Sequence, residues 1–419
     1  VICRARLTQK VTRNRLRPGK LKFSKRKNMA TLKKQASAQA RNDTAVVSYD
    51  DPLVRRGWMS QGIIQAASKS FWLPFTGTDS SKVVYQKNET SAAEGNTVVF
   101  DYSGNYATEG YSGYEQAYGK GEAKMKFSST LTIEVVRYPI NNGKKFDGKN
   151  IGDLSITEHG NSKSQLADMF IRAKDQYMFD AAQGFLRGEE PTHIIRPNDV
   201  ALSSLTTSHK MTYDFLARLE DAAKTGRGFT TGSNRRPIEP YMTVDGEGVW
   251  LCIIDAVQKR QLMQDPTFRS IMTNADVRGE NNTMIRGVVA RLGNLIISEV
   301  SNFYGSSSSN ALPKTKCEIA GLRTRDLAGN WYGRSGYNPA SHVASRGLIL
   351  GKGALQFGVG MMPDYKWQPS QDFQATSESC LEAWVQVQRT KLVPADADYD
   401  DAKVANIDYG MFVFDTYNS

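Results

Sequence analysis

Residues 162–187 read SKSQLADMFIRAKDQYMFDAAQGFLR, which is the longest helical pattern in the chain. Apolar residues recur there in steps of three and four, so a helix would carry them on one face. These residues are Leu166, Met169, Phe170, Ala173, Tyr177, Ala181 and Phe185. The polar residues, among them Lys174, Asp175 and Asp180, fall mostly elsewhere. At a rise of about 1.5 Å per residue, the helix would be a rod of roughly 40 Å.

The ends of this helix also have sequence signals. Ser162 with Gln165 matches a capping box, and Gly188 supplies a left-handed stop. We therefore expect a core helix in a large α+β domain.

The charge of the chain is concentrated at its start. The formal net charge is +11, yet residues 1–28 hold eleven cations and no acid. Without them, 43 of the 54 Lys and Arg residues remain, which equals the 43 Asp and Glu residues. The rest of the 419-residue chain is thus neutral and long enough to bury a large core in one or two domains. No run approaches 18 apolar residues, so no membrane span is predicted.

The basic start has two interpretations, and both stay open. It is either a real arm that grips nucleic-acid phosphates without reading sequence, or a translated leader upstream of a start at Met29. Residues 25–28, KRKN, are also what a purine-rich ribosome-binding site would encode. The candidate DNA-facing residues are Arg4, Arg6, Arg13, Arg15, Arg17, Lys25, Arg26 and Lys27.

Residues 71–138 are rich in strand signals, at 82–85, 97–100 and 127–136. Between the last two lies TEGYSGYEQAYGKGEAK, residues 108–124, with Tyr111, Tyr114 and Tyr118. This stretch is too long for a tight turn and too polar for a core. It fits a long two-stranded loop that projects from the body, and the alternative is a surface loop without fixed structure.

The second half of the chain reads as mixed helix and strand. We expect a helix over 208–225 closed by glycines, a hairpin over 241–254 and two consecutive helices from 255 onward. Further strands are expected at 288–290, 295–297, 354–359, 380–389 and 409–414. In the last of these, Met411 and Val413 face one side and Phe412 and Phe414 the other.

No catalytic, cofactor-binding or metal site is predicted. Residues 347–353, GLILGKG, fail as a phosphate loop, and the acidic residues 396–401 fail as a calcium loop. The histidines and cysteines are scattered and share no motif, so structural roles are expected for the histidines and reduced thiols for the cysteines. These residues are His159, His193, His209, His342, Cys3, Cys252, Cys317 and Cys380.

The order of elements resembles the major capsid proteins of tailed bacteriophages, which have the HK97-like fold, and more narrowly those of N-four-like phages. The resemblance covers residues 58–419. It rests on the order of the elements and on their residue patterns, and it includes no catalytic signature. The segments that carry it are KSFWLPF (69–75), GNTVVF (95–100), the helical stretch through 186, VWLCIIDAVQKRQLMQDPTFRSIM (249–272) and IRGVVARLGNLIISE (285–299).

The resemblance implies a division into domains. Residues 29–70 would be an amino-terminal arm, 71–126 an extended loop over the neighbouring subunit, 127–239 a peripheral domain with the spine helix 162–187, 240–374 an apical domain, and 375–419 return strands of the peripheral domain. Residues 1–28 would be a basic extension without a counterpart in the family.

The resemblance also implies a structural protein and not an enzyme. Copies would form hexamers and pentamers of an icosahedral shell around double-stranded DNA, with a portal protein at one vertex and possible scaffolding or decoration proteins. The chain would be made in the bacterial cytoplasm and reside in the virion. We expect Tyr111, Tyr114 and Tyr118 to contact neighbouring subunits. The alternatives are a soluble nucleic-acid-binding protein that uses the basic arm, and an enzyme with an unrecognised site.

Overall fold

The computed structural model describes residues 70–88, 96–104, 110–121, 126–144, 154–244, 246–276, 288–303, 320–338, 343–369, 376–394 and 406–418. The chain divides into two compact units, Val1–Arg55 and Arg56–Ser419, and every described residue belongs to the second. The expected extension 1–28 and the expected arm, except for Ser70, lie outside the described residues. The second unit mixes helices and strands along the chain, which confirms the α+β class.

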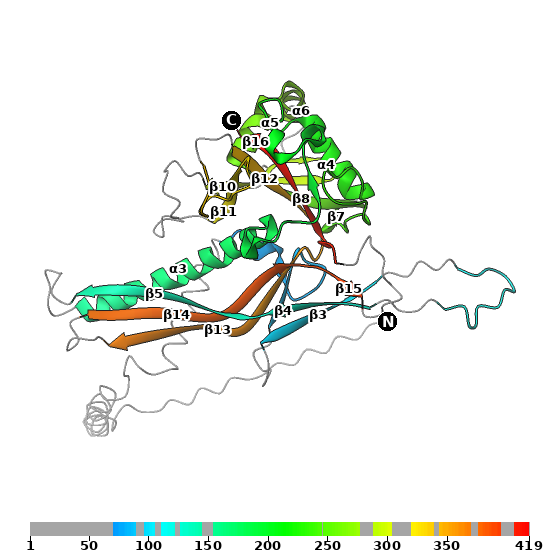
Figure 1. Ribbon diagram of the computed structural model, residues 1–419. Coiled ribbons are helices and arrows are strands. Elements are labelled where there is room, and N and C mark those ends of the chain that lie inside the picture. Colours follow the sequence, from blue (N-terminus) through cyan, green and yellow to red (C-terminus); the bar gives the residue numbers. More distant parts are fainter. Residues whose placement is uncertain are drawn as a thin grey trace, which may run out of the picture. The chain divides into compact units, whose positions relative to one another are not determined.

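Two sheets lie on one side of the helix α3 (Figure 1). The larger has five strands in the order β1 (Thr76–Gly77), β2 (Val84–Asn88), β13 (Leu355–Pro369), β14 (Thr376–Arg389) and β5 (Glu134–Lys144). The smaller has three, β15 (Val393–Pro394), β4 (Lys126–Thr132) and β3 (Thr97–Ser103). The prediction of a single strand at 127–136 is therefore wrong, because these residues are divided between β4 and β5. The chain leaves one sheet for the other at Ile133, whose N–H bonds the carbonyl of Asn96 at 2.6 Å.

An eight-stranded sheet lies on the other side of α3 (Figure 1). Its order is β6 (Ile194–Ile195), β16 (Met411–Asn418), β12 (Val343–Leu350), β11 (Gly321–Asp326), β10 (Leu295–Phe303), β8 (Glu247–Asp255) and β7 (Met242–Val244), and β9 (Val288–Leu292) pairs with β10. The helices α4 (Tyr213–Thr225), α5 (Ala256–Gln264) and α6 (Pro266–Asp276) belong to the core on its far face. Short 3-10 helices occupy connections, namely η1 (Leu73–Phe75), η2 (Leu186–Gly188), η3 (Pro197–Asp199) and η4 (Leu202–Ser204).

The strand β16 confirms the expected alternation. Met411 and Val413 belong to the core that contains α3, and Phe412 and Phe414 to the core that contains α4. β14 lies in the five-stranded sheet and β16 in the eight-stranded one, and the expected domain bounds stay a prediction. Residues 411–414 are apolar on both faces, which suits a strand in a sheet that is covered on both sides.

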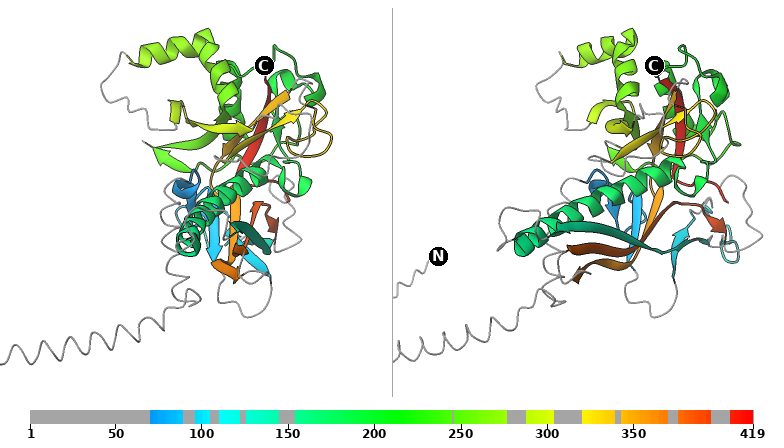
Figure 2. Two further views of the ribbon diagram at one scale, coloured as in Figure 1. Left: turned by 90° about the vertical axis from the view of Figure 1, so that its left-hand side faces the viewer. Right: turned by 60° about the vertical axis from the view of Figure 1, so that its left-hand side comes forward.

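The central helix is α3, Leu154–Gln183 (Figures 1 and 2). It begins eight residues before the expected start, so Ser162 lies inside it and is not its cap. No proline interrupts the added residues, which make about two turns, and Gly160 costs a helix only about 1 kcal/mol. The helix ends at Gln183 because Gly184 adopts φ +90°, where a Cβ would lie 2.6 Å from the Glu189 carbonyl oxygen. The expected stop, Gly188, ends η2 instead, at φ +70°.

The helix α3 buries two chemically different faces. Its apolar side chains, among them Leu166, Phe170 and Phe179, pack with residues of both large sheets in one core. Its second buried face is polar, and it includes Gln176, Asp180 and Gln183. Sequence periodicity places Asp180 mostly off the apolar face, and the pattern cannot show that a distant strand covers it.

This polar face binds the main chain of β11. The amide of Gln176 donates to the Gly321 carbonyl at 3.1 Å and accepts from the Gly321 N–H at 3.0 Å. Gln183 makes the same two bonds to Arg323, at 3.3 and 2.9 Å. The Arg323 side chain closes the contact with two bonds to the Asp180 carboxylate, at 2.6 and 2.9 Å. The glutamines thus satisfy strand groups that would otherwise be buried without partners.

A second polar cluster joins the strands around β16. Asp415 is fully buried and accepts from Arg346 of β12 at 2.7 Å and from Arg196, which follows β6, at 3.0 Å. Burial favours the neutral acid, but Arg346 and then Arg196 hold the pKa of Asp415 below its usual value. His193, directly before β6, is also buried and lies 2.9 Å through Nε2 from the Ser233 carbonyl oxygen.

We expect Arg323→Met to be severely destabilising. It leaves Asp180 buried without its cation, so the free energy of unfolding should fall by about 3–5 kcal/mol. Urea unfolding of the unassembled subunit measures this loss. The control is Lys224→Met, which breaks the more exposed Lys224–Glu220 pair and should cost less than about 1 kcal/mol. Equal losses in the two variants would contradict the importance of the buried contact.

We expect His193 to make stability depend on pH. Burial, with Arg235 nearby, lowers the pKa of His193 to about 4. Between about pH 6.5 and 4 the unfolded chain therefore binds a proton that the folded chain does not, so stability is lost as the pH falls. Comparing urea unfolding at pH 7 and pH 4.5, wild type should lose about 2 kcal/mol more than His193→Gln. The same loss in both proteins would refute this assignment.

Candidate assembly surface

The segment 110–121 is the most exposed part of the described chain. Every residue in it is exposed, and Figure 1 shows it extending away from the sheets. β3 and β4 pair as far as Ser103 and Lys126, which forms the base of the expected two-stranded loop. The described residues 110–121 themselves contain no strand, so pairing does not continue to the tip.

The three expected contact tyrosines lie in this segment. Tyr114 and Tyr118 have relative exposures of 109% and 90%. Tyr111 is 43% exposed, and the Nζ of Lys120 lies 4.7 Å from its ring centroid. Among the residues that the structure describes, Tyr114 and Tyr118 make no ring contact or hydrogen bond. Such rings have a large apolar area available for burial against another surface.

The expected DNA-facing residues are not positioned by the structure. They lie outside the described residues, so their grouping is known from the sequence alone. They are Arg4, Arg6, Arg13, Arg15, Arg17, Lys25, Arg26 and Lys27.

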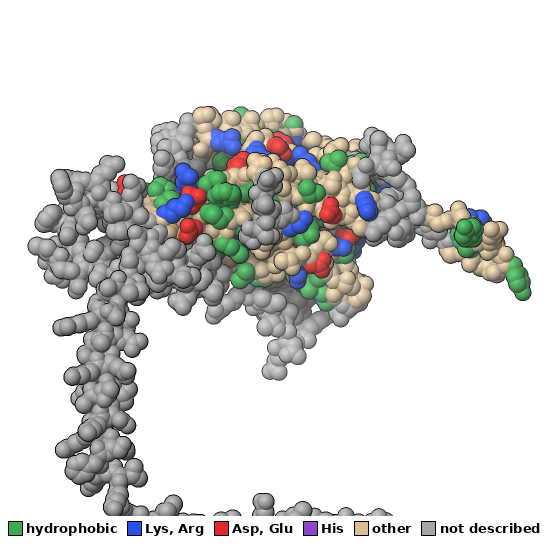
Figure 3. Space-filling model, turned by 90° about the horizontal axis from the view of Figure 1, so that it is seen from below, with side chains coloured by type: hydrophobic (Ala, Val, Ile, Leu, Met, Phe, Trp, Pro, Cys, Tyr) green, Lys and Arg blue, Asp and Glu red, His purple; other side chains and the backbone are tan. Residues whose placement is uncertain are grey.

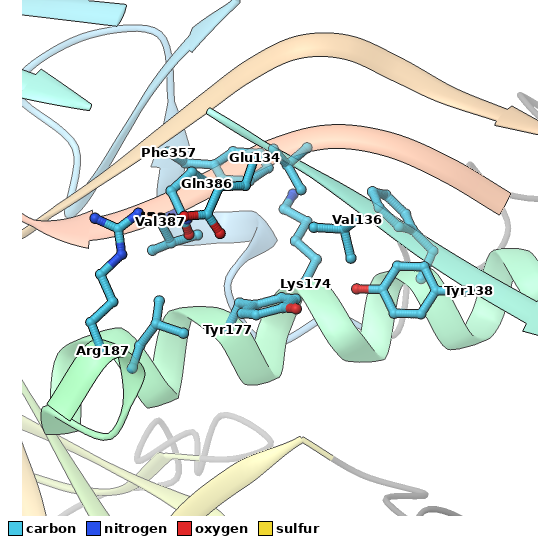
Figure 4. A pocket seen from close by; sticks show the side chains of 12 residues that line it. Glu134, Val136, Tyr138, Lys174, Tyr177, Arg187, Phe357, Gln386 and Val387 are labelled. Carbon is cyan, nitrogen blue, oxygen red and sulfur yellow. Dashed lines mark hydrogen bonds and ion pairs between the residues drawn. The ribbon is translucent and has the colours of Figure 1, made fainter. Parts of the chain in front are cut away.

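A cavity of about 190 Å³ lies between α3 and the five-stranded sheet (Figure 4). Lys174 of α3 reaches into it, with Nζ 5.0 Å from the ring centroid of Phe357. Burial lowers the pKa of this amine. Arg187 and Glu134, which also line the cavity, form an ion pair at 3.0 Å.

The lining of the cavity combines three charged side chains with mainly apolar ones. Apart from Lys174 and the Glu134–Arg187 pair, its lining is mainly aromatic and aliphatic, and it includes no His or Cys. The sequence analysis missed Lys174, because helical periodicity assigned it to the polar side. The signal that could have found it was its position one turn before Met178, a buried residue.

The histidines and the glycine-rich stretch named in the sequence analysis have structural roles, as far as they lie within the described residues. His193 and His209 are buried and hydrogen-bonded, as expected of structural histidines. Gly347 lies in β12, where a Cβ would meet the ring of Phe414 at 2.1 Å, so it is a packing glycine. The acidic residues 396–401 lie outside the described residues. In the part of the chain that the structure describes, no group of three or more His, Cys, Asp or Glu could hold a metal ion.

The described helices also include none that is both long and apolar enough to cross a membrane.

No family model matches this chain. The major capsid protein of Pseudomonas phage KPP25 is 22% identical to it over 284 residues, which cover 59% of this chain and 72% of that protein. The capsid of Ralstonia phage GP4 is 19% identical, with a TM-score of 0.57 over 84% of this chain and 92% of that one. The capsid of Helicobacter pylori bacteriophage KHP30 is 14% identical, with a TM-score of 0.60 over 83% and 92%.

The narrower resemblance to N-four-like phages stays a prediction. The chain has the HK97-like fold of tailed-phage capsid proteins.

Proposed function

We propose that this chain is a major capsid protein, which assembles with copies of itself into the icosahedral shell around the double-stranded DNA of a tailed bacteriophage. The observation that carries the proposal is the fold, shared with phage capsid chains over more than four fifths of this chain. The relative from phage KPP25, itself named a major capsid protein, points the same way.

The exposed segment 110–121 supports association between copies. Its tyrosines have little to pack against within the described subunit, and burial of aromatic area is a main contribution to protein interfaces. Tyr111, Tyr114 and Tyr118 are the proposed contacts in hexamers and pentamers. A body with equal numbers of acidic and basic residues would also let many copies pack without mutual repulsion.

The proposed domains follow the family division, adjusted to the sheets. The five-stranded sheet with α3 corresponds to the peripheral domain and the eight-stranded sheet with α4, α5 and α6 to the apical one. By this assignment β13 belongs to the peripheral domain although it lies within 240–374, and α4 belongs to the apical domain although it lies within 127–239.

Other partners follow from the role. The shell would carry a portal protein at one vertex and could recruit scaffolding or decoration proteins. Residues 1–28, if present in the mature protein, would face the packaged DNA and neutralise phosphates without reading sequence. The subunit would be made in the host cytoplasm and reside in the virion as a structural protein.

We expect purified protein, alone or with a candidate scaffold, to form closed particles visible by negative-stain electron microscopy. Replacing Tyr111, Tyr114 and Tyr118 together by Ala should lower the particle yield about tenfold or more, because interface hot spots are rich in tyrosine. The matched control replaces the exposed residues Leu73, Met242 and Val393 by Ala. Unchanged yield and stability of the tyrosine variant would show that these rings are not contacts.

Deleting residues 1–28 separates the proposed function from its main alternative. A capsid subunit should still assemble without them, since the described fold begins later. A soluble nucleic-acid-binding protein that used this arm would instead bind DNA as a monomer, with an affinity that falls steeply with salt and disappears on deletion. Electrophoretic mobility shift at 50 and 200 mM salt, beside electron microscopy, distinguishes the two.

A further inference from the structure

On the face of the five-stranded sheet that is turned away from α3, charged side chains lie close to partners of opposite sign. Figure 3 shows Lys and Arg interspersed with Asp and Glu on this face. Arg137 and Lys366, for example, both bind Oε2 of Glu382, at 3.0 and 2.8 Å. Lys174, which lies on α3, differs from them. It is half-buried, and it has no ion pair or hydrogen bond with any residue that the structure describes.

Two carboxylates lie near this amine, and both are engaged by other groups. Asp175 accepts from the Ser70 hydroxyl at 2.6 Å and from the Phe71 N–H at 2.8 Å. Glu134, which lines the same cavity, pairs with Arg187 at 3.0 Å. An ammonium group in the cavity therefore lacks the hydrogen-bonded anion that a buried charge normally has.

The surroundings of the amine are mainly apolar. Nζ of Lys174 lies 5.0 Å from the ring centroid of Phe357, and Val136, Phe170 and Leu186 also line the cavity (Figure 4). The face of an aromatic ring attracts a cation, but it does not replace the acceptors that the three N–H donors of an ammonium group can bind. The cavity thus presents unused donors beside apolar walls.

Two hydroxyl groups can add a second donor. Tyr138 of β5 and Tyr177 of α3 line the cavity, and their hydroxyl groups lie close to one another (Figure 4). Burial raises the pKa of both phenols, so both keep their protons at neutral pH. A bond between the two hydroxyl groups uses only one of these protons, and the other can be donated to a third group. The cavity can therefore offer an N–H and an O–H donor to the two oxygen atoms of a carboxylate.

We propose that this cavity binds a small monocarboxylate with an apolar body, of which benzoate is the test case, with the carboxylate at Nζ of Lys174. The volume of about 190 Å³ is slightly larger than that of an engineered apolar cavity of about 150 Å³ that binds benzene in another protein. An inorganic anion such as phosphate would leave the apolar walls without contacts, and a neutral hydrocarbon would leave the amine without a partner. The inference goes beyond the proposed function, because a single subunit contains the whole site.

The cavity is open to solvent at the Glu134–Arg187 pair, whose side chains are 63% and 40% exposed. Arg187 has φ +60°, in the left-handed region that residues other than glycine rarely adopt. Such a conformation persists where surrounding contacts fix it, and the ion pair to β5 is one such contact. A ligand would enter beside this pair and contact both α3 and the five-stranded sheet.

Isothermal titration calorimetry of the full-length subunit tests the site. Benzoate should bind at least tenfold more tightly than benzamide, which has a similar shape but no charge, because charge-assisted hydrogen bonds are about twice as strong as neutral ones. Lys174→Met keeps most of the length of the side chain and removes the amine, so it should weaken benzoate binding about tenfold or more. The control Lys224→Met removes an exposed lysine of α4 and should leave the affinity unchanged. Circular dichroism verifies that each variant is folded.

The affinity should also depend on pH, which a purely structural lysine would not cause. Burial lowers the pKa of Lys174 in the free subunit, and a bound anion favours the ammonium form. Binding is therefore accompanied by proton uptake, and the affinity falls as the pH rises towards the ordinary lysine pKa of about 10.4. The other titratable groups around the amine are Asp175, Glu134, Tyr138, Tyr177 and Arg187. The NMR signal of carbon-13-labelled Lys174 Cε separates its titration from theirs, and it should give a higher pKa with benzoate than without.

Several results would overturn the site. Benzamide might bind as tightly as benzoate only if the charge played no part, and unchanged affinity of Lys174→Met would exclude the amine. Absence of heat at benzoate concentrations up to about 10 mM, where even weak binding is detected, would refute the site as a whole. A loss with Arg187→Met but not with Lys174→Met would place the anion at the opening, against the proposal.

The proposal stays testable if Lys174→Met does not fold. The titration of Lys174 in the wild-type subunit then decides, and a pKa that benzoate leaves unchanged refutes the contact. None of these measurements uses assembly, so a negative result leaves the capsid function as it stands.

Discussion

The architecture depends on one helix that packs apolar side chains against both large sheets and adds a polar contact to one of them. The apolar side chains of α3 share one core with both sheets, and their attraction is strong but has little directional preference. Towards β11 it presents Gln176 and Gln183, each of which both donates to and accepts from one strand residue. Hydrogen bonds have narrow distance and angle ranges, so this polar contact fixes the register between helix and strand that apolar packing alone would leave loose.

Much of the fold can be predicted from the sequence, because amphipathic periodicity shows which side of a single helix or strand is buried. Such periodicity predicts the hairpin around residue 245, the two faces of β16 and the long helix. The sheet to which each strand belongs could not be predicted. β14 and β16 both have alternating side chains, and the residues of a strand do not show which other strand it pairs with. The same limit hid the buried role of Asp180, whose partner Arg323 lies 143 residues later in the chain.

The exposed tyrosine segment could be proposed from the sequence for a different reason. Residues 108–124 combine aromatic rings with polarity, and such a stretch cannot bury its rings within its own length. The exposure of Trp384 could not be predicted, because the alternation of β14 indicates one buried and one outward face whether or not a tryptophan on the outward face is covered. Its exposure depends on where the three-stranded sheet ends, which is a property of the tertiary structure.

The position of β16 has a consequence for the timing of folding during synthesis. Residues 411–418 lie between β6 and β12, and Asp415 supplies the charge that Arg196 and Arg346 require. A nascent polypeptide that has not reached these residues has an open sheet and lacks the carboxylate that binds both guanidinium groups. The eight-stranded sheet can therefore be completed only after residues 411–418 have been synthesised, because both neighbours of β16 lie earlier in the chain.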